Sequence, residues 1–293
     1  MSPDATESTV ETIPANPATA LYNILSTIAI SNPTASITDG WQAALGVPAE
    51  SVDFTRLHAE VVGLFSSVCT CLRVNSELWT DYSEYTNQWY RGVIFPGDWG
   101  HPASELFPNI EVLKQLRGLG NNLKYAGIAG GQWNADVKIK LNKLIEMWNG
   151  VLGKDSLPSD VARDIHRRLD ELIWLASQIR HLGIEPVAMA GNQLLMAGDR
   201  ALVREKLPKN IKKTIIKAMA ASLIFVGAVD EGTDHVAGIL TNTNKIIEQV
   251  EVLKDEQRQL EKGPPKQLES GRGAQDSSEA NDEGPTPPTE SSQ

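Results

Sequence analysis

The sequence predicts an all-α protein, in which a multi-helix, bundle-like domain is followed by a helical arm and by disordered tails. Apolar residues recur every three or four positions in several long segments, which places them on one face of a helix. Segments that alternate apolar and polar residues between turn signals, the pattern of a strand, are almost absent. With 41% hydrophobic and 22% charged residues, the chain also has the composition of a soluble globular protein.

The helical domain is expected over residues 16–183, after a disordered N-terminal arm of residues 1–15 that lacks periodicity. Asn16 and Pro17 are typical of a helix N-cap and first turn, and this helix should run to about Ser31. A short helix should follow around residues 41–45 and end at a glycine in position 46.

Three longer helices of this domain are predicted from apolar stripes, and Gly183 should end the last of them. The stripes consist of Leu57, Val61, Leu64, Val68 and Leu72; of Val137, Leu141, Leu144, Trp148 and Val151; and of Val161, Ile165, Leu169, Leu172, Ala176 and Ile179. Between the first two stripes, glycines cluster over residues 118–131. Because they lack phosphate-loop spacing and follow no strand, we interpret them as loops flanking a short helix.

The helical arm is expected over residues 184–262, and a disordered acidic tail over residues 263–293. In the arm, a helix over about 186–206 should be interrupted at Gly191 and Gly198, and a last helical region should begin near residue 210. This last region has an unbroken heptad pattern. Its apolar face, which we expect to pair with a helix of a second copy or of the same chain, contains Ile239, Ile246, Val250, Leu253 and Leu260.

Aromatic residues are concentrated between residues 79 and 107. The candidates for binding a ligand or protein partner are Trp79, Tyr82, Trp89, Arg91 and Trp99, because these residue types dominate binding hot spots. Asp98 and His101 lie in the same Gly/Pro-rich loop and are candidates for a catalytic acid and base. The alternative interpretation is that the rings belong to the core and that the loop only wraps around it.

A basic run before the uncharged segment 218–229 is the candidate surface for an anionic partner. It contains Lys209, Lys212, Lys213 and Lys217. One interpretation is a segment that lies on or inserts into an anionic membrane, and the other is a buried central helix of a bundle. Twelve uncharged residues are too few for a conventional transmembrane span, which needs about 20.

Glu231 and His235 would lie one helical turn apart in a continuous helix and are a candidate pair of metal ligands. No third ligand is visible, and Gly232 and Thr233 favour a helix break instead. The sequence also lacks the motifs of a zinc protease, a hydrolase nucleophile elbow or a paired-cysteine metal site. We therefore expect no cofactor and no metal.

The formal charge of −10 comes mostly from the two ends of the chain, so the helical part is close to neutral. This excludes the basic field of a nucleic-acid-binding protein. The two cysteines, Cys69 and Cys71, are spaced so that they point apart on a helix, and the N-terminus has acids where a signal peptide has bases. The expected location is cytoplasmic.

These observations favour a non-catalytic interaction or assembly protein, with a protein partner or a second copy as its target. One alternative is a soluble effector whose segment 200–229 acts on anionic membranes. Another is an all-α enzyme or ligand-binding protein that uses the loop of residues 91–101.

Overall fold

The computed structural model describes residues 13–31, 33–126, 133–204 and 207–229. Within these ranges the chain forms helices and no β-strand, which confirms the all-α class. The expected arm at residues 1–15 falls almost entirely outside the described residues. The heptad segment, residues 236–260, and the acidic tail, residues 263–293, lie wholly outside the described residues.

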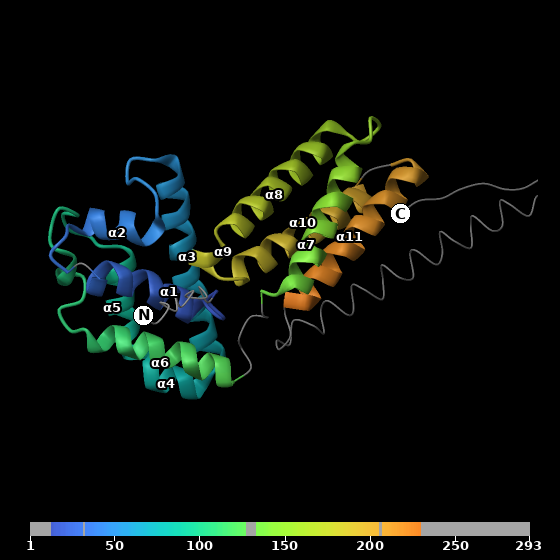
Figure 1. Ribbon diagram of the computed structural model, residues 1–293. Coiled ribbons are helices and arrows are strands. Elements are labelled where there is room, and N and C mark those ends of the chain that lie inside the picture. Colours follow the sequence, from blue (N-terminus) through green and yellow to red (C-terminus); the bar gives the residue numbers. More distant parts are fainter. Residues whose placement is uncertain (1–12, 32, 127–132, 205–206, 230–293) are drawn as a thin grey trace, which may run out of the picture. The chain divides into compact units, whose positions relative to one another are not determined.

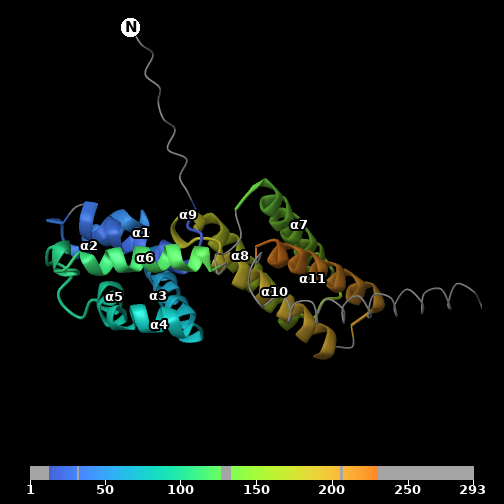
Figure 2. The same cartoon turned by 90° about the horizontal axis from the view of Figure 1, so that it is seen from below.

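The first group of helices is built around α1 (Pro17–Ser26), which continues into a π-helical turn (Thr27–Ser31). It packs against α3 and α6, and Figure 2 shows α1 and α6 side by side. The other helices of this group are α2 (Ile37–Leu45), α3 (Val52–Val74), α4 (Ser76–Tyr82), α5 (Thr86–Val93) and α6 (Glu111–Tyr125). Short 3-10 turns lie at Ser83–Tyr85 and Ala103–Glu105.

Capping contacts confirm the predicted start of α1 and the predicted end of α2, whereas α2 begins four residues earlier than expected, at Ile37. The side chain of Asn16 accepts a hydrogen bond from the Thr19 backbone N–H at 2.9 Å, and Pro17 occupies the first turn. The Asn16 amide also donates to the Gly120 carbonyl at 2.8 Å, so this cap ties α1 to α6. Gly46 ends α2 with a φ of 69°, a conformation that favours glycine.

The interpretation of Gly118 and Gly120 as loop residues is wrong, because both lie inside α6. A buried stripe that includes Leu116, Leu119 and Leu123 holds this helix together and outweighs the cost of about 1 kcal/mol for each glycine. A Cβ at Gly120 would lie only 2.7 Å from the Thr19 hydroxyl oxygen. Glycine is therefore needed here so that α1 and α6 can approach closely.

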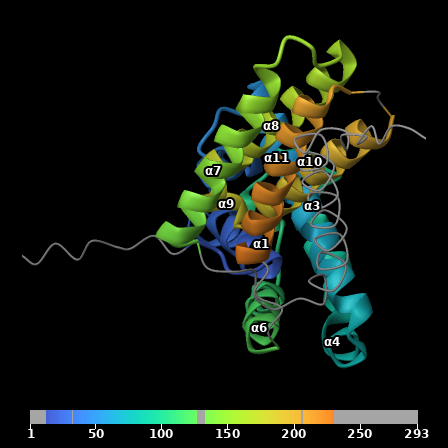
Figure 3. The same ribbon diagram turned by 90° about the vertical axis from the view of Figure 1, so that its right-hand side faces the viewer.

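The second group consists of α7 (Ala135–Leu152), α8 (Ser159–Ser177), the short α9 (Ile179–Leu182), α10 (Glu185–Arg204) and α11 (Lys209–Val229). The four long helices run alongside one another in Figures 1 and 3. α10 packs between α8 and α11, and α7 contacts both α8 and α11. The sequence placed α10 and α11 in an arm after residue 183, but they pack directly on the helices before it.

The expected interruptions at Gly191 and Gly198 do not occur, because α10 is continuous across both. Each glycine instead lies where α10 touches a large side chain. A Cβ at Gly191 would be 3.1 Å from the Phe225 ring, and one at Gly198 would be 2.6 Å from Met219 and 2.8 Å from Trp148. These glycines allow close helix packing.

A glycine-to-alanine pair tests this packing. We expect Gly198→Ala to lower the free energy of unfolding by about 1–3 kcal/mol, because the added methyl group must displace Trp148 or Met219. Gly150→Ala in α7 is the matched control, since no atom lies within 4 Å of its Cβ position. It should raise stability by about 0.5–1 kcal/mol. Urea unfolding measures both, and equal effects of the two substitutions would contradict the packing argument.

Candidate functional site

The aromatic residues between 79 and 99 divide into core and surface positions. Trp89 is fully buried, and its indole N–H donates to the Val112 carbonyl at 2.9 Å. Tyr82 is also buried, and its hydroxyl oxygen accepts a hydrogen bond from Asn122 at 2.9 Å. Their proposed role in partner binding is therefore wrong, because these rings belong to the core. Trp79, at 43% exposure, and Arg91 do remain on the surface.

Trp99 is half-buried and joins an aromatic cluster below the loop. Its ring stacks on Trp41 with the centroids 6.1 Å apart, and it also contacts Phe54 and His58 edge-on. The His58 ring nitrogen Nε2 lies 2.9 Å from the Val93 carbonyl oxygen, which fixes the ring beneath the start of the loop. The Trp99 ring, a candidate for binding a ligand or partner, is thus packed against the protein itself.

The loop backbone caps α2. The backbone N–H groups of Ile37 and Thr38 donate to the carbonyls of His101 and Trp99 at 2.8 and 3.0 Å. The first N–H groups of a helix have no partner within the helix, so these loop carbonyls satisfy them. This arrangement matches the alternative interpretation, in which the loop wraps around the core.

Asp98 and His101 are both exposed, and each is engaged locally. Asp98 accepts a hydrogen bond from the Gly100 N–H at 2.8 Å, as in a turn. The Nδ1 atom of His101 lies 2.9 Å from a carboxylate oxygen of Glu105, one helical turn further on. The structure does not join the two into an acid–base pair within a cavity.

A cavity that the sequence did not indicate lies between α3, α8 and α10. Its volume is about 160 Å³. Three carboxylates line it, Glu60, Glu171 and Glu185, one from each helix. Arg56 forms an ion pair with Glu171, and its guanidinium stacks 3.6 Å from the Trp174 ring centroid. Sequence spacing could not reveal this cluster, because its members come from helices far apart in the chain.

Burial is the main cause of the pKa shifts of two carboxyl groups that line this cavity. It raises the pKa of Glu185, and a hydrogen bond from Ser67 offsets only part of the effect. Burial also raises the pKa of Glu60, with a further increase from the charge of Glu171 and a decrease from Arg56. The pKa of the neighbouring Cys71 thiol rises to about 11, first through burial and then through Glu185, so the thiol stays protonated. The cavity suits a hydrogen-bond donor or a cation, but no group of three side chains in the described ranges could hold a metal ion.

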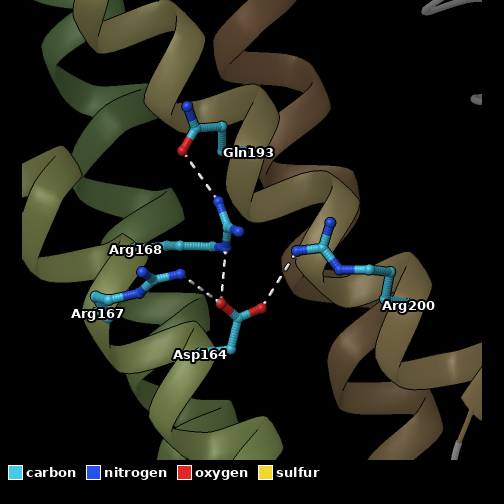
Figure 4. A network of polar contacts seen from close by, with 5 residues as sticks. All are labelled: Asp164, Arg167, Arg168, Gln193 and Arg200. Carbon is cyan, nitrogen blue, oxygen red and sulfur yellow. Dashed lines mark hydrogen bonds and ion pairs between the residues drawn. The ribbon is translucent and has the colours of Figure 1, made fainter.

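A polar network joins α8 and α10 beside this cavity (Figure 4). Asp164 accepts hydrogen bonds from Arg167, Arg168 and Arg200 at 3.0–3.2 Å, and Arg168 also donates to Gln193 at 3.0 Å. Burial alone would raise the pKa of Asp164, but the arginines outweigh it and lower the pKa. The network ties α10 to α8 along their outer edge.

The α10 stripe, defined as Met189, Met196 and Val203, lies next to this network. These side chains are 54%, 55% and 79% exposed and are spaced seven residues apart. The heptad pattern of residues 236–260 is not repeated in α10, because the positions between these three residues are polar or charged: Asn192, Gln193, Asp199 and Arg200. The stripe becomes visible only when the structure shows which side of α10 faces solvent.

The basic run lies in the first half of α11. Lys209, Lys213 and Lys217 are exposed and Lys212 is half-buried. The uncharged segment that follows is largely internal, with buried side chains that include Met219, Phe225 and Val229. The structure therefore supports a bundle helix for this segment. Glu231 and His235, and the heptad residues from Ile239 to Leu260, lie outside the described residues.

In the described part of the chain, α3 alone is long and apolar enough to cross a membrane, by length and composition. The core helix of a soluble protein passes the same test, and α3 buries one stripe, from Phe54 to Leu72, among the other helices. This is weak evidence for a membrane span.

The raised pKa of Glu185 predicts a pH-dependent stability difference. The folded state favours the protonated acid, so its contribution is full below the ordinary value of 4.5 and is lost as the pH rises through the raised pKa. We expect Glu185→Gln to be more stable than wild type at pH 8 and about equal to it at pH 4, as measured by urea unfolding. The exposed Glu50→Gln is the control. Equal destabilisation of Glu185→Gln at both pH values would contradict the assignment.

Comparisons with protein-family models, with curated proteins and with solved structures found no match to this chain. Its role must therefore be argued from the surfaces and contacts described above.

Proposed function

We propose that the chain is a non-catalytic helical interaction and assembly protein. The observation that carries this proposal is the α10 stripe, in which three large apolar side chains face solvent at heptad spacing. Exposed apolar side chains on one helical line are expected where another helix packs. Two of the three are methionines, whose flexible side chains adapt to an opposing surface.

The occupant that we propose for the α10 stripe is the same stripe of a second copy. In an antiparallel pair with its two-fold axis at Met196, Met189 of each copy lies beside Val203 of the other. Such an isologous contact needs one self-complementary patch and no second surface. The heptad segment of residues 236–260 is the second pairing element of the proposal, and it pairs with a helix of a second copy or of the same chain.

Neither the exposed Asp98 and His101 nor the acid-lined cavity carries a catalytic proposal. Asp98 and His101 bind local partners, and the cavity holds carboxylates without a neighbouring nucleophile in an activated state, since the pKa of Cys71 is raised. An interaction role therefore remains the function that the geometry supports best.

Self-association should depend on Met196. We expect the wild-type chain to increase in mass with concentration, and Met196→Glu to stay monomeric, because a carboxylate at the centre of the contact would lose its water. Light scattering over a concentration series measures this. Ile139→Glu on α7 is the matched control, since Ile139 is also an exposed apolar residue, and it should associate as wild type does. A wild-type chain that is monomeric at every concentration would refute the self-pairing.

A second candidate function is action on anionic membranes, and it is favoured by the exposed lysines of α11. Lys213 and Lys217 lie one turn apart and precede the apolar end of the helix. Insertion would require α11 to leave α7 and α10 and to expose its buried side chains.

Vesicle co-sedimentation separates the two functions. We expect an assembly protein to stay in the supernatant with both neutral vesicles and vesicles rich in phosphatidylserine. Pelleting with the anionic vesicles alone, lost in Lys213→Glu/Lys217→Glu, would instead favour the membrane function.

A further inference from the structure

We propose that residues 236–256 pack antiparallel on the exposed side of α11 in the same chain. The docking surface is the α11 outer face, defined as Lys213, Lys217, Ala220, Ile224 and Gly227. The inference rests on the part of the proposed function in which the heptad segment pairs with a helix, and it identifies that helix.

The α11 outer face has room for a further helix. The opposite side of α11 is buried against α7 and α10. The outer residues recur every three or four positions, so they form one continuous line along the helix. Ile224 is 59% exposed, and Ala220 and Gly227 around it are small enough for another helix to approach closely.

Charge divides this face into two halves. The first half carries the exposed lysines Lys209, Lys213 and Lys217, whereas the second half, around Ile224, has no charged residue. A helix that covers the whole face should therefore be apolar at one end and acidic at the other.

Residues 236–256 of the heptad segment have an apolar half and an acidic half, in the order that an antiparallel helix requires. Residues 236–247 contain a single charged residue, Lys245. Residues 248–256 contain four acids, Glu248, Glu251, Asp255 and Glu256, and only one base. In an antiparallel arrangement the apolar half lies on Ile224 and the acidic half lies beside the lysines. A parallel arrangement would place the acids on the uncharged half.

The lengths of α11, of residues 236–256 and of the connection between them favour pairing within one chain. α11 has 21 residues, which span about 30 Å, and residues 236–256 are equal in number. Six residues, 230–235, connect the two, within the range of about 2–8 that joins antiparallel helices in bundles. So short a connection gives the segment a high effective concentration at α11, which favours docking there over a second copy.

Amide hydrogen exchange on the full-length chain tests the proposal. We expect the amides of residues 236–256 to be protected in the wild type. Ile224→Glu should increase their exchange by about tenfold or more, because docking would bury its carboxylate. Since Ile224 is exposed, the variant should keep α11 folded, which protection of the α11 amides checks. Ile139→Glu is the matched control and should leave the segment protected.

A charge exchange adds a second readout. Lys217→Glu should raise the exchange of the segment by repulsion from Glu248, and the double variant Lys217→Glu/Glu248→Lys should restore protection. Ile246→Asp should release the segment without a change in the mass of the protein.

Unprotected amides in the wild type would overturn the docking, as would protection that Ile224→Glu leaves unchanged. Protection that falls on dilution would assign the segment to a second copy and overturn docking within one chain, while leaving the assembly function standing. Conversely, a protected segment in a chain that never self-associates would uphold the docking and refute self-pairing of the α10 stripe.

Discussion

The position of the Trp148 indole between α7, α10 and α11 is the constraint on which the second group of helices depends. The ring is fully buried, and its N–H donates to the Ser222 hydroxyl of α11 at 2.8 Å. Its edge lies where α10 carries Gly198, so no larger residue fits. A buried indole N–H without a partner is costly, and the ring has no space to turn away. These contacts fix how α10 and α11 are rotated, and therefore which of their side chains face solvent.

The exposed faces of α10 and α11 follow from that rotation. With Gly191 and Gly198 turned toward α11, the α10 stripe must point outward. With Ser222 and Phe225 turned inward, Ile224 and Lys217 must lie on the outside. The α10 stripe and the α11 outer face are thus exposed because the opposite sides of the two helices pack closely around Trp148.

The loop of residues 91–101, which the sequence suggested as a binding site, makes structural contacts within the protein. Its carbonyls cap α2, and Trp99 covers Trp41. In the described part of the chain, the Trp41 indole nitrogen is the one buried side-chain polar atom without a hydrogen-bond partner. Packing of the Trp41 ring against His58 and Trp99 must outweigh that cost. Sequence composition alone cannot distinguish such a cluster from a ligand site.

The sequence by itself determined the helical class, the capped start of α1, the glycine that ends α2, and the buried stripes of α3 and α7. All of these depend on neighbours within about four residues, whose spacing decides which side chains share a face. The tertiary structure alone decided that Gly120, Gly191 and Gly198 are contact points rather than breaks, that Trp89 is buried, and that Glu60, Glu171 and Glu185 meet at one cavity. Each of these outcomes depends on which helices lie against one another, and residues far apart in a chain reveal their contacts only when the helices pack.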